Sequence, residues 1–173
     1  MRRVSFVLVM TALGCGSASP PAPASAVIET DATSYVATPL TTPGVHSHHV
    51  QVIAKIRNIG NDIVRVSRCT STTTYPPYGV NPAGDGEAAW NPNLTCSIGA
   101  PYQDLPPGAE RTDTLQLLAP WSRTLTGEPV GVIDGRFYIL YDTRICGRVS
   151  ANGLCQPDNV YEVVRSNEFT ISR

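Results

Sequence analysis

Positive charge is scarce in this chain and is nowhere concentrated. The 173 residues include 13 Lys or Arg against 14 Asp or Glu, and Lys55 is the single lysine. Arg2 and Arg3 form the only adjacent pair of basic residues. A nucleic-acid-binding surface needs a dense positive face to meet the phosphates. This class of function is therefore excluded.

Long apolar runs and catalytic motifs are also missing. The longest apolar run covers residues 4–13 and is half of the roughly 20 residues that a membrane-spanning helix needs. No Cys-x-x-Cys pair supplies zinc ligands, and no Gly-x-Ser-x-Gly supplies a nucleophile. Asp85 and Glu87 in "GDGEAAW" offer too few oxygen ligands for Ca²⁺ and are typical of a polar loop. We therefore expect neither an enzyme nor a bound cofactor.

What the sequence does have begins with an export signal at residues 1–14. Two arginines follow the initiating methionine, the apolar run comes next, and the segment closes with "ALGC", which ends at Cys15. This ending resembles the lipobox of bacterial lipoprotein signals, in which a small residue precedes a cysteine that receives a lipid. Ala12 stands where that family usually has leucine. The resemblance implies that cleavage leaves Cys15 as a lipidated N-terminus.

The segment behind Cys15 favours a lipid anchor. Its next eleven residues are all Gly, Ser, Ala or Pro, which is typical of an extended tether with nothing to bury. We assign residues 15–26 to a lipidated tether and residues 27–173 to a folded domain. The tether would hold the domain at the outer membrane of a bacterial cell envelope, periplasmic or surface-exposed. The alternative is an ordinary secretory signal cleaved near Ala18 or Ala24, which would discard Cys15.

The rest of the chain predicts short β-strands. Its 15 prolines and 14 glycines interrupt every helical pattern. The clearest strand covers residues 49–58, where apolar and polar residues alternate as on a half-buried strand. Further strands are expected at 27–30 with 34–37 as one broken strand, and at 63–69, 110–118, 134–142, 160–165 and 167–172. The expected core positions are Val50, Val52, Ala54, Ile56, Ile63 or Val64, Val66, Leu115, Leu117, Phe137, Ile139 and Tyr141.

Turn signals separate these strands at short intervals. "NIGND" at 58–62 predicts a tight turn, since Gly60 and Asn61 tolerate a positive φ, and "LPPG" at 105–108 predicts another. Residues 70–100, rich in Thr, Pro, Gly and Asn, are expected to be irregular. About seven strands with frequent turns are typical of an antiparallel β-sandwich.

The order of these features resembles the small immunoglobulin-like domains of bacterial envelope proteins, which include proteinase-inhibitor-type modules and many lipoproteins. The motifs that carry the resemblance are Asn58-Ile59-Gly60-Asn61, Cys69, Trp90, Cys96, Leu105-Pro106-Pro107-Gly108, Gly135-Arg136-Phe137-Tyr138 and Ser166-Asn167-Glu168-Phe169-Thr170-Ile171. The resemblance implies an immunoglobulin-like antiparallel β-sandwich. It implies no particular function, because this fold carries many unrelated roles.

Four of the five cysteines lie in the predicted domain, and an exported protein can pair them. Three connectivities are possible. A turn at 151–153 would bring Cys146 and Cys155 together, so we favour this pair. Cys69 and Cys96 then remain as the second pair, which the resemblance supports.

The only histidines are His46, His48 and His49, in the sequence "HSHH". Alternate residues of a strand share a face, so His46 and His48 could hold one copper or zinc ion. The alternative is a polar entrance to the strand that follows. No carboxylate lies near these histidines in sequence to orient their rings.

Aromatic residues supply the remaining signal for binding. Tyrosine and tryptophan on proline-stiffened loops make rigid contact surfaces for a protein or glycan partner. The candidates are Tyr75, Tyr78, Trp90, Tyr102 and Trp121. The alternative is structural: Trp90 fills the core of the sandwich, and the tyrosines cover loop backbone.

Together these features predict a lipid-anchored, disulfide-bonded binding or structural module of the cell envelope. Its partners would be the membrane, through the lipid on Cys15, and a protein or glycan. A first alternative is a protease inhibitor that presents a loop from residues 70–100 or 144–158. A second alternative is copper or zinc binding through the three histidines.

Overall fold

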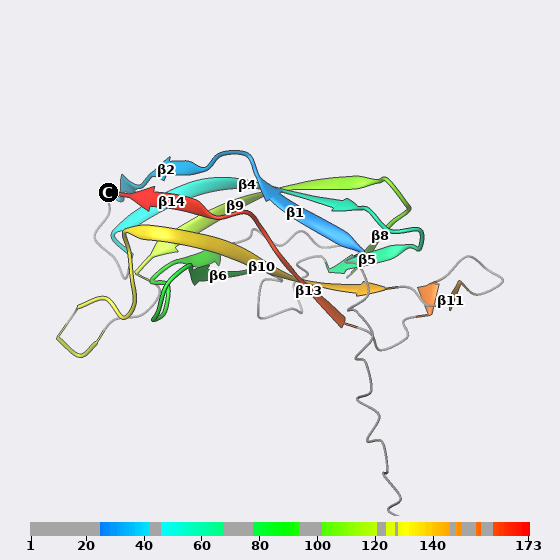
Figure 1. The fold of residues 1–173 in the computed structure, drawn as a ribbon. Helices are drawn as coiled ribbons and strands as arrows, with labels where there is room; N and C mark the ends of the chain where they lie inside the picture. The colour runs from blue at the N-terminus through cyan, green and yellow to red at the C-terminus, as the bar shows by residue number, and fades with distance from the viewer. Residues whose placement is uncertain are drawn as a thin grey trace, which may run out of the picture.

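Two β-sheets stacked face to face make up the folded part of the chain (Figure 1). The structure is a computed structural model, and it describes residues 25–41, 46–67, 78–93, 102–120, 124–126, 128–145, 148–149, 155–156 and 161–173. Within these ranges there is no helix, and so none of the length and hydropathy needed to cross a membrane. The predicted all-β sandwich is confirmed.

The described ranges contain fourteen strands, about twice the predicted number. They are β1 (Ala26–Thr30), β2 (Ser34–Val36), β3 (Thr38–Pro39), β4 (His48–Asn58), β5 (Val64–Ser67), β6 (Tyr78–Pro82), β7 (Asn91–Asn93), β8 (Tyr102–Leu105), β9 (Glu110–Ala119), β10 (Gly135–Ile145), β11 (Arg148–Val149), β12 (Cys155–Gln156), β13 (Tyr161–Arg165) and β14 (Phe169–Ser172). The number is larger because single strands of the sandwich are interrupted. β5 and β6 pair with successive parts of β10 along one edge, and β13 and β14 do so along the other.

The order of the strands defines the type of sandwich. Sheet A has the order β1-β4-β9-β7, and β3 is added beside β4. Sheet B has the order β2-β14-β10-β5-β8, and β13 and β6 also pair with β10. Immunoglobulin-like sandwiches have strands A, B, E and D in one sheet and G, F, C and C′ in the other. Sheets A and B reproduce these spatial orders, so the predicted immunoglobulin-like fold is confirmed, although β8 in the C′ position follows β7 in the chain.

Three long strands supply nearly half of the buried apolar residues. In β4, β9 and β10 every second side chain points between the sheets, because a strand has a side-chain period of two. The predicted core residues are buried, and in β5 the inward positions belong to Val64 and Val66 and not to Ile63. The sequence pattern therefore predicted the inner faces of these strands correctly.

The predicted broken strand near the N-terminus changes sheets at its break. β1 pairs antiparallel with β4 in sheet A, and β2 pairs parallel with β14 in sheet B. The sandwich is thus antiparallel except for this pair and one isolated parallel bridge in the described ranges. The chain crosses from sheet A to sheet B between β1 and β2, and β2 then pairs with β14, the last strand.

The predicted tight turn at 58–62 is a corner between the two sheets, because β4 and β5 lie in different sheets. No residue of the corner has a positive φ. Asn58 organises it from a side chain that is 1% exposed. Its Nδ2 donates to the carbonyl oxygens of Asp62 at 2.7 Å and Leu105 at 2.8 Å. Its Oδ1 accepts from the backbone N–H of Gly60 at 2.9 Å.

The turn predicted from "LPPG" does form, between β8 and β9. The backbone N–H of Ala109 donates to the carbonyl of Pro106 at 2.9 Å, and Gly108 has a φ of +77°. A type II turn favours proline at its second position and requires a positive φ at its third. Pro107 and Gly108 meet these requirements.

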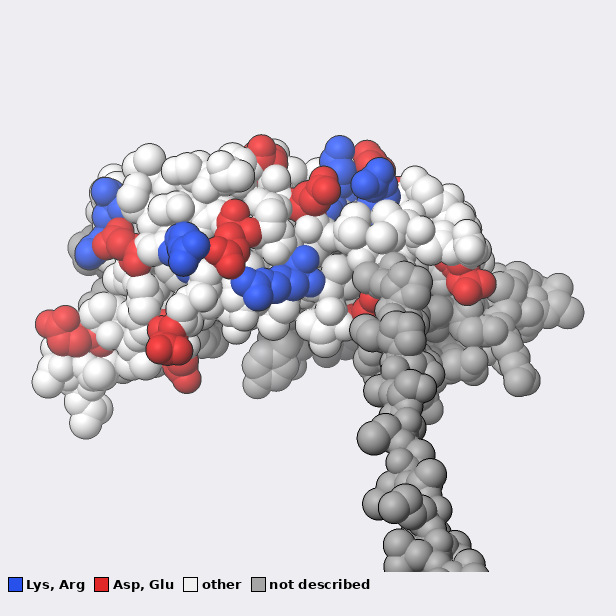
Figure 2. Space-filling view, in the orientation of Figure 1, with Lys and Arg blue, Asp and Glu red and all other residues white. Residues whose placement is uncertain are grey.

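Charged side chains of both signs are interspersed over the upper part of the face in Figure 2. Several form exposed ion pairs, among them Lys55 with Glu110 at 3.5 Å and Arg165 with Glu168 at 2.9 Å. Exposed pairs of this kind contribute about 0–1 kcal/mol each. The apolar core and the buried polar groups therefore matter more for stability.

Asn58→Asp is expected to lower the free energy of unfolding by about 2–3 kcal/mol, because a carboxylate has no hydrogen to donate to the two carbonyls that Asn58 binds. Chemical denaturation followed by tryptophan fluorescence measures the loss. Asn61→Asp is the matched control, since Asn61 is exposed in the same corner, and it should stay within about 0.5 kcal/mol. Equal losses for the two variants would contradict the role of Asn58.

Candidate functional site

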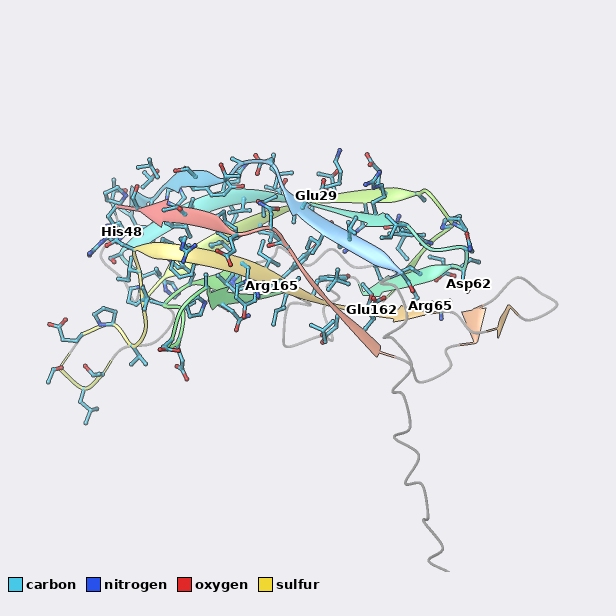
Figure 3. The ribbon with its side chains drawn as sticks, viewed as in Figure 1. Glu29, His48, Asp62, Arg65, Glu162 and Arg165 are labelled. Carbon is cyan, nitrogen blue, oxygen red and sulfur yellow. The ribbon has the colours of Figure 1, made fainter. Side chains whose placement is uncertain are left out.

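Ser25, the first residue that the structure describes, lies at one end of the sandwich. The backbone N–H of Ser25 donates to both carboxylate oxygens of Glu162 at 3.1 Å (Figure 3), and its carbonyl accepts from Ile59 at 2.9 Å and Gly60 at 3.1 Å. Ala26 is fully buried, so the fold starts before the predicted boundary at residue 27. We call this end, which holds the β4–β5 corner and the start of β13, the entry end.

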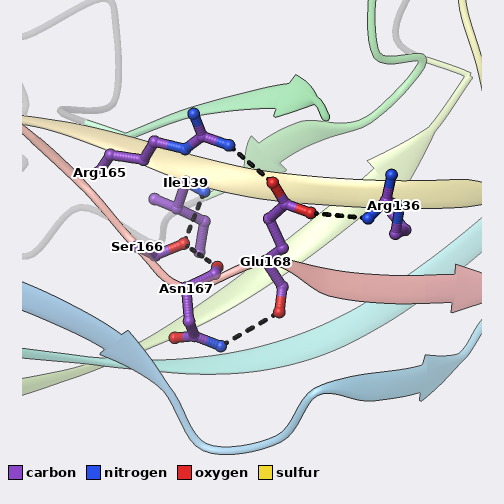
Figure 4. A network of polar contacts seen from close by, with 6 residues as sticks. All are labelled: Arg136, Ile139, Arg165, Ser166, Asn167 and Glu168. Atoms are coloured by element: carbon purple, nitrogen blue, oxygen red, sulfur yellow. Dashed lines mark hydrogen bonds and ion pairs between the residues drawn. The ribbon is translucent and has the colours of Figure 1, made fainter. Parts of the chain in front are cut away.

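A bulge in the last strand, whose residues are drawn in Figure 4, holds the other end of β1. The register with β10 shifts between β13 and β14, which leaves one extra residue in the segment 166–168. Ser166 restores the pairing, because its N–H donates to the carbonyl of Ile139 and its Oγ accepts from the N–H of Ile139, both at 2.9 Å. Asn167 then reaches β1, where its side chain binds the backbone N–H and the Oγ1 of Thr30, each at 2.8 Å. The first strand is thus held at both ends by the last strand of the other sheet.

Several predicted site residues lie outside the described residues. They are Cys15, Cys69, Tyr75, Cys96, Trp121 and Cys146, together with the side chains of Tyr102 and Cys155. The predicted turn at 151–153 falls between β11 and β12, whose register puts Cys155 opposite Val149. Lipidation and the two cysteine pairings stay predictions.

The three histidines lie at the opposite end, which we call the distal end, where β4 begins and β9 ends (Figure 3). His46 Nδ1 is 2.7 Å from the carbonyl oxygen of Pro120, and His48 Nδ1 is 2.8 Å from the Oγ of Ser47. His49 Nδ1 is buried and has no hydrogen-bond partner among the described residues. The rings thus have three different surroundings. Within the described ranges no three His, Cys, Asp or Glu side chains are grouped to hold a metal ion.

A polar cluster interrupts the apolar core in the half nearer the entry end. Asp113 on β9 accepts hydrogen bonds from the hydroxyl of Tyr78 and from Arg111, whose Nε and Nη2 lie 2.9 and 2.6 Å from its Oδ2. Arg111 also donates to the hydroxyl of Tyr141 at 3.0 Å. Burial, and then the negative charge of Asp113, raise the pKa of Tyr78. These hydrogen bonds join β9 of sheet A to β6 and β10 of sheet B, so the cluster acts as a structural crosslink between the sheets.

Two of the predicted partner-binding aromatic residues belong to the core. Tyr78 is 4% exposed and Trp90 is 3% exposed, so neither presents its ring to a partner. The indole N–H of Trp90 donates to the carbonyl of Ile133 at 2.8 Å. For Trp90 the structural alternative is therefore correct.

The sequence reasoning missed a group of exposed apolar side chains on the loop between β9 and β10. Leu125 is fully exposed, and Val130 and Val132 are 37% and 38% exposed. The signal that could have found them is their setting, since they stand among Thr, Gly and Pro in "TLTGEPVGV". Apolar and polar residues do not alternate in this stretch, so it has no apolar face to bury.

No family model and no curated protein matches this chain. Among solved structures it is similar to a FixG-related protein from Vibrio parahaemolyticus, with 10% identity over 87% of this chain and 100% of that chain and a TM-score of 0.40. It is also similar to the ASH or PapD-like domain 7 of human CEP192, with 14% identity over 95% of each chain and a TM-score of 0.33. Both TM-scores are low, so the assignment of the fold depends on the strand order of this chain.

The free energy of unfolding is expected to fall as the pH rises above about 10, where tyrosine in the unfolded chain ionises while Tyr78 in the folded chain keeps its proton. The folded state then binds more protons than the unfolded state, and the loss reaches up to about 1.4 kcal/mol per pH unit for this group. Tyr78→Phe should flatten the decline in urea denaturation at a series of alkaline pH values.

Tyr35 also lowers the free energy of unfolding as the pH rises, because partial burial and then its hydrogen bond to Asp31 raise its pKa to about 12. Tyr78→Phe should therefore keep a residual decline, which the double variant with Tyr35→Phe reduces further. An unchanged slope in Tyr78→Phe would contradict the burial of its hydroxyl against Asp113.

Proposed function

We propose that this chain is a lipid-anchored binding module of a bacterial cell envelope. In this proposal Cys15 carries the lipid, residues 16–24 form the tether, and the β-sandwich that starts at Ser25 binds a partner. The module acts by binding and carries out no catalytic step.

The observation that carries the proposal is the fixed attachment of the first residue of the domain. Ser25 is bound to Glu162 and to the β4–β5 corner, at the entry end of the sandwich. A tether joined at this point leaves the distal end on the far side of the domain from the membrane. The chain from Cys15 to Ser25 spans at most about 33–36 Å, or about 31 Å in the extended form that prolines favour.

The described side chains also favour binding over catalysis. The buried amide of Asn58 and the half-buried cluster around Asp113 are engaged in hydrogen bonds that hold the fold together. Leu125, Val130 and Val132, on the loop between β9 and β10, are exposed and so are accessible to other molecules. This division of roles supports a binding module.

Two disulfides belong to the proposal, Cys69–Cys96 and Cys146–Cys155. Cys69 follows β5 and Cys96 follows β7, and β6, which continues the line of β5, contacts β7. This contact between the sheets supports the first pair. By loop entropy the two rings contribute roughly 2.5–3.5 kcal/mol each.

Cys15→Ser is expected to abolish labelling of the protein by a fatty-acid probe and to release it from the membrane fraction, because the thiol is the site of lipid attachment. Metabolic labelling of cells and fractionation of their envelopes measure both effects. Ser17→Ala, a change in the same tether that keeps the thiol, is the matched control and should stay labelled and membrane-bound.

Mass spectrometry of the mature N-terminus distinguishes the alternatives. A modified Cys15 at the N-terminus agrees with the proposal. Cleavage near Ala18 or Ala24, or a Cys15→Ser protein that still fractionates with membranes, would overturn the lipid anchor.

A further inference from the structure

We propose that the distal end carries an interaction surface for a partner protein that presents basic side chains around an apolar contact. The surface, which we call the distal projection, consists of residues 84–88, 124–126 and 128–133. The inference rests on the proposed function, because it names the surface through which the anchored module binds.

The apolar part of the distal projection stands clear of the sheets. The loop between β9 and β10 extends beyond the sandwich at the lower left of Figure 1. Leu125 is fully exposed on this loop, and Val130 and Val132 keep more than a third of their surface exposed. Single exposed apolar side chains are common on protein surfaces. Three lie on this one loop, and the leucine is fully exposed, so the loop offers apolar surface that a partner can cover.

The base of the loop is fixed to the domain. The N–H of Val132 donates to the carbonyl of Glu87 at 2.7 Å, and the N–H of Ala89 donates to the carbonyl of Val132 at 2.9 Å. Gly131 has a φ of +98°, and a Cβ at this position would lie 2.5 Å from the carbonyl oxygen of Glu87. Only glycine permits this close approach. A loop held in this way loses little conformational freedom on binding, which favours affinity.

The charge of the distal projection defines its partner. Asp85, Glu87 and Glu128 are exposed, and none of them forms an ion pair with a described residue. Asp134, at the foot of the loop, is by contrast paired with Arg173 at 2.6 Å. Among the described residues of the projection, Figure 2 shows acidic and neutral atoms and no basic atoms on the face in view.

The exposed carboxylates of Asp85, Glu87 and Glu128 form the acidic rim of the distal projection. Together with the exposed apolar side chains, this rim complements a basic surface with an apolar pocket. An anionic membrane surface repels the same rim, and the projection lies at the end opposite Ser25, where the tether is attached. The observations therefore favour a protein partner over a lipid surface.

The test uses a photo-crosslinking amino acid, p-benzoylphenylalanine, in place of Leu125 in the full chain in living cells. A single protein adduct is expected. The double variant Glu87→Lys and Glu128→Lys should reduce its yield at least about tenfold, because like charges then face each other. The same crosslinker in place of Val163, which is 58% exposed on β13, is the matched control and should not give this adduct.

The protein identified from the adduct is then purified and titrated with the native chain. Leu125→Ala should weaken binding about tenfold, while Val163→Ala leaves it unchanged, and added salt should weaken it further. No adduct at 125, an adduct unaffected by charge reversal, or crosslinking to lipid or glycan would overturn the inference. Lipid labelling of Cys15 in the same cells separates the two proposals, because label without adduct refutes only the distal projection and adduct without label refutes only the anchor.

Discussion

Hydrogen bonding along β10 is the constraint on which the rest of the sandwich depends. This strand pairs with β13 and β14 along one edge and with β5 and β6 along the other. Each of these four strands has only four or five residues, and an isolated pair of strands is at best marginally stable in water, so each depends on the sheet that β10 organises. The inner face of β10, with Phe137, Ile139 and Tyr141, is fully or almost fully buried. A slip of one residue would turn these side chains outward, so the alternation of β10 sets the register of all four partners.

The interruptions of the strands are where polar groups connect the two sheets. The bulge before β14 aims Asn167 at Thr30, and the corner after β4 encloses Asn58. Each connection places a side-chain amide, buried at Asn58 and exposed at Asn167, against backbone groups of another segment, and a buried backbone group is costly to leave unpaired. One consequence concerns β1. This strand has the chain entry at one end and the crossover to sheet B at the other, and Glu162 and Asn167 hold it at both. A force applied to the chain at Ser25 would therefore act on the last strand as well as on the first.

Sequence alone predicted the parts of the fold in which one strand shows its own pattern. The alternation in β4, β9 and β10 runs over ten or eleven residues and needs no knowledge of the neighbours. β6 and β7, with the sequences "YGVNP" and "NPN", have no such pattern and form because β10 and β9 offer them edges. The corner at Asn58 looks like a hairpin turn in sequence, because local residues do not reveal which sheet the next strand joins. For the same reason Trp90 could be read as a surface or a core residue until the contact with Ile133 was known.

The distal projection was harder to predict from sequence, because its role depends on how far it lies from Ser25 across the folded domain. β10 has eleven residues, and the ten steps between its ends span about 33–34 Å from the entry end to the distal end, a length similar to the full reach of residues 15–25. With a lipid on Cys15, the sandwich would thus roughly double the distance from the membrane at which the module can act. The sandwich, held at Ser25, keeps the loop between β9 and β10 at the end opposite this attachment (Figure 1). A lipid anchor on Cys15, as proposed, would then raise the effective concentration of the distal projection in the layer beyond the domain, which is where the proposed partner of complementary charge would meet it.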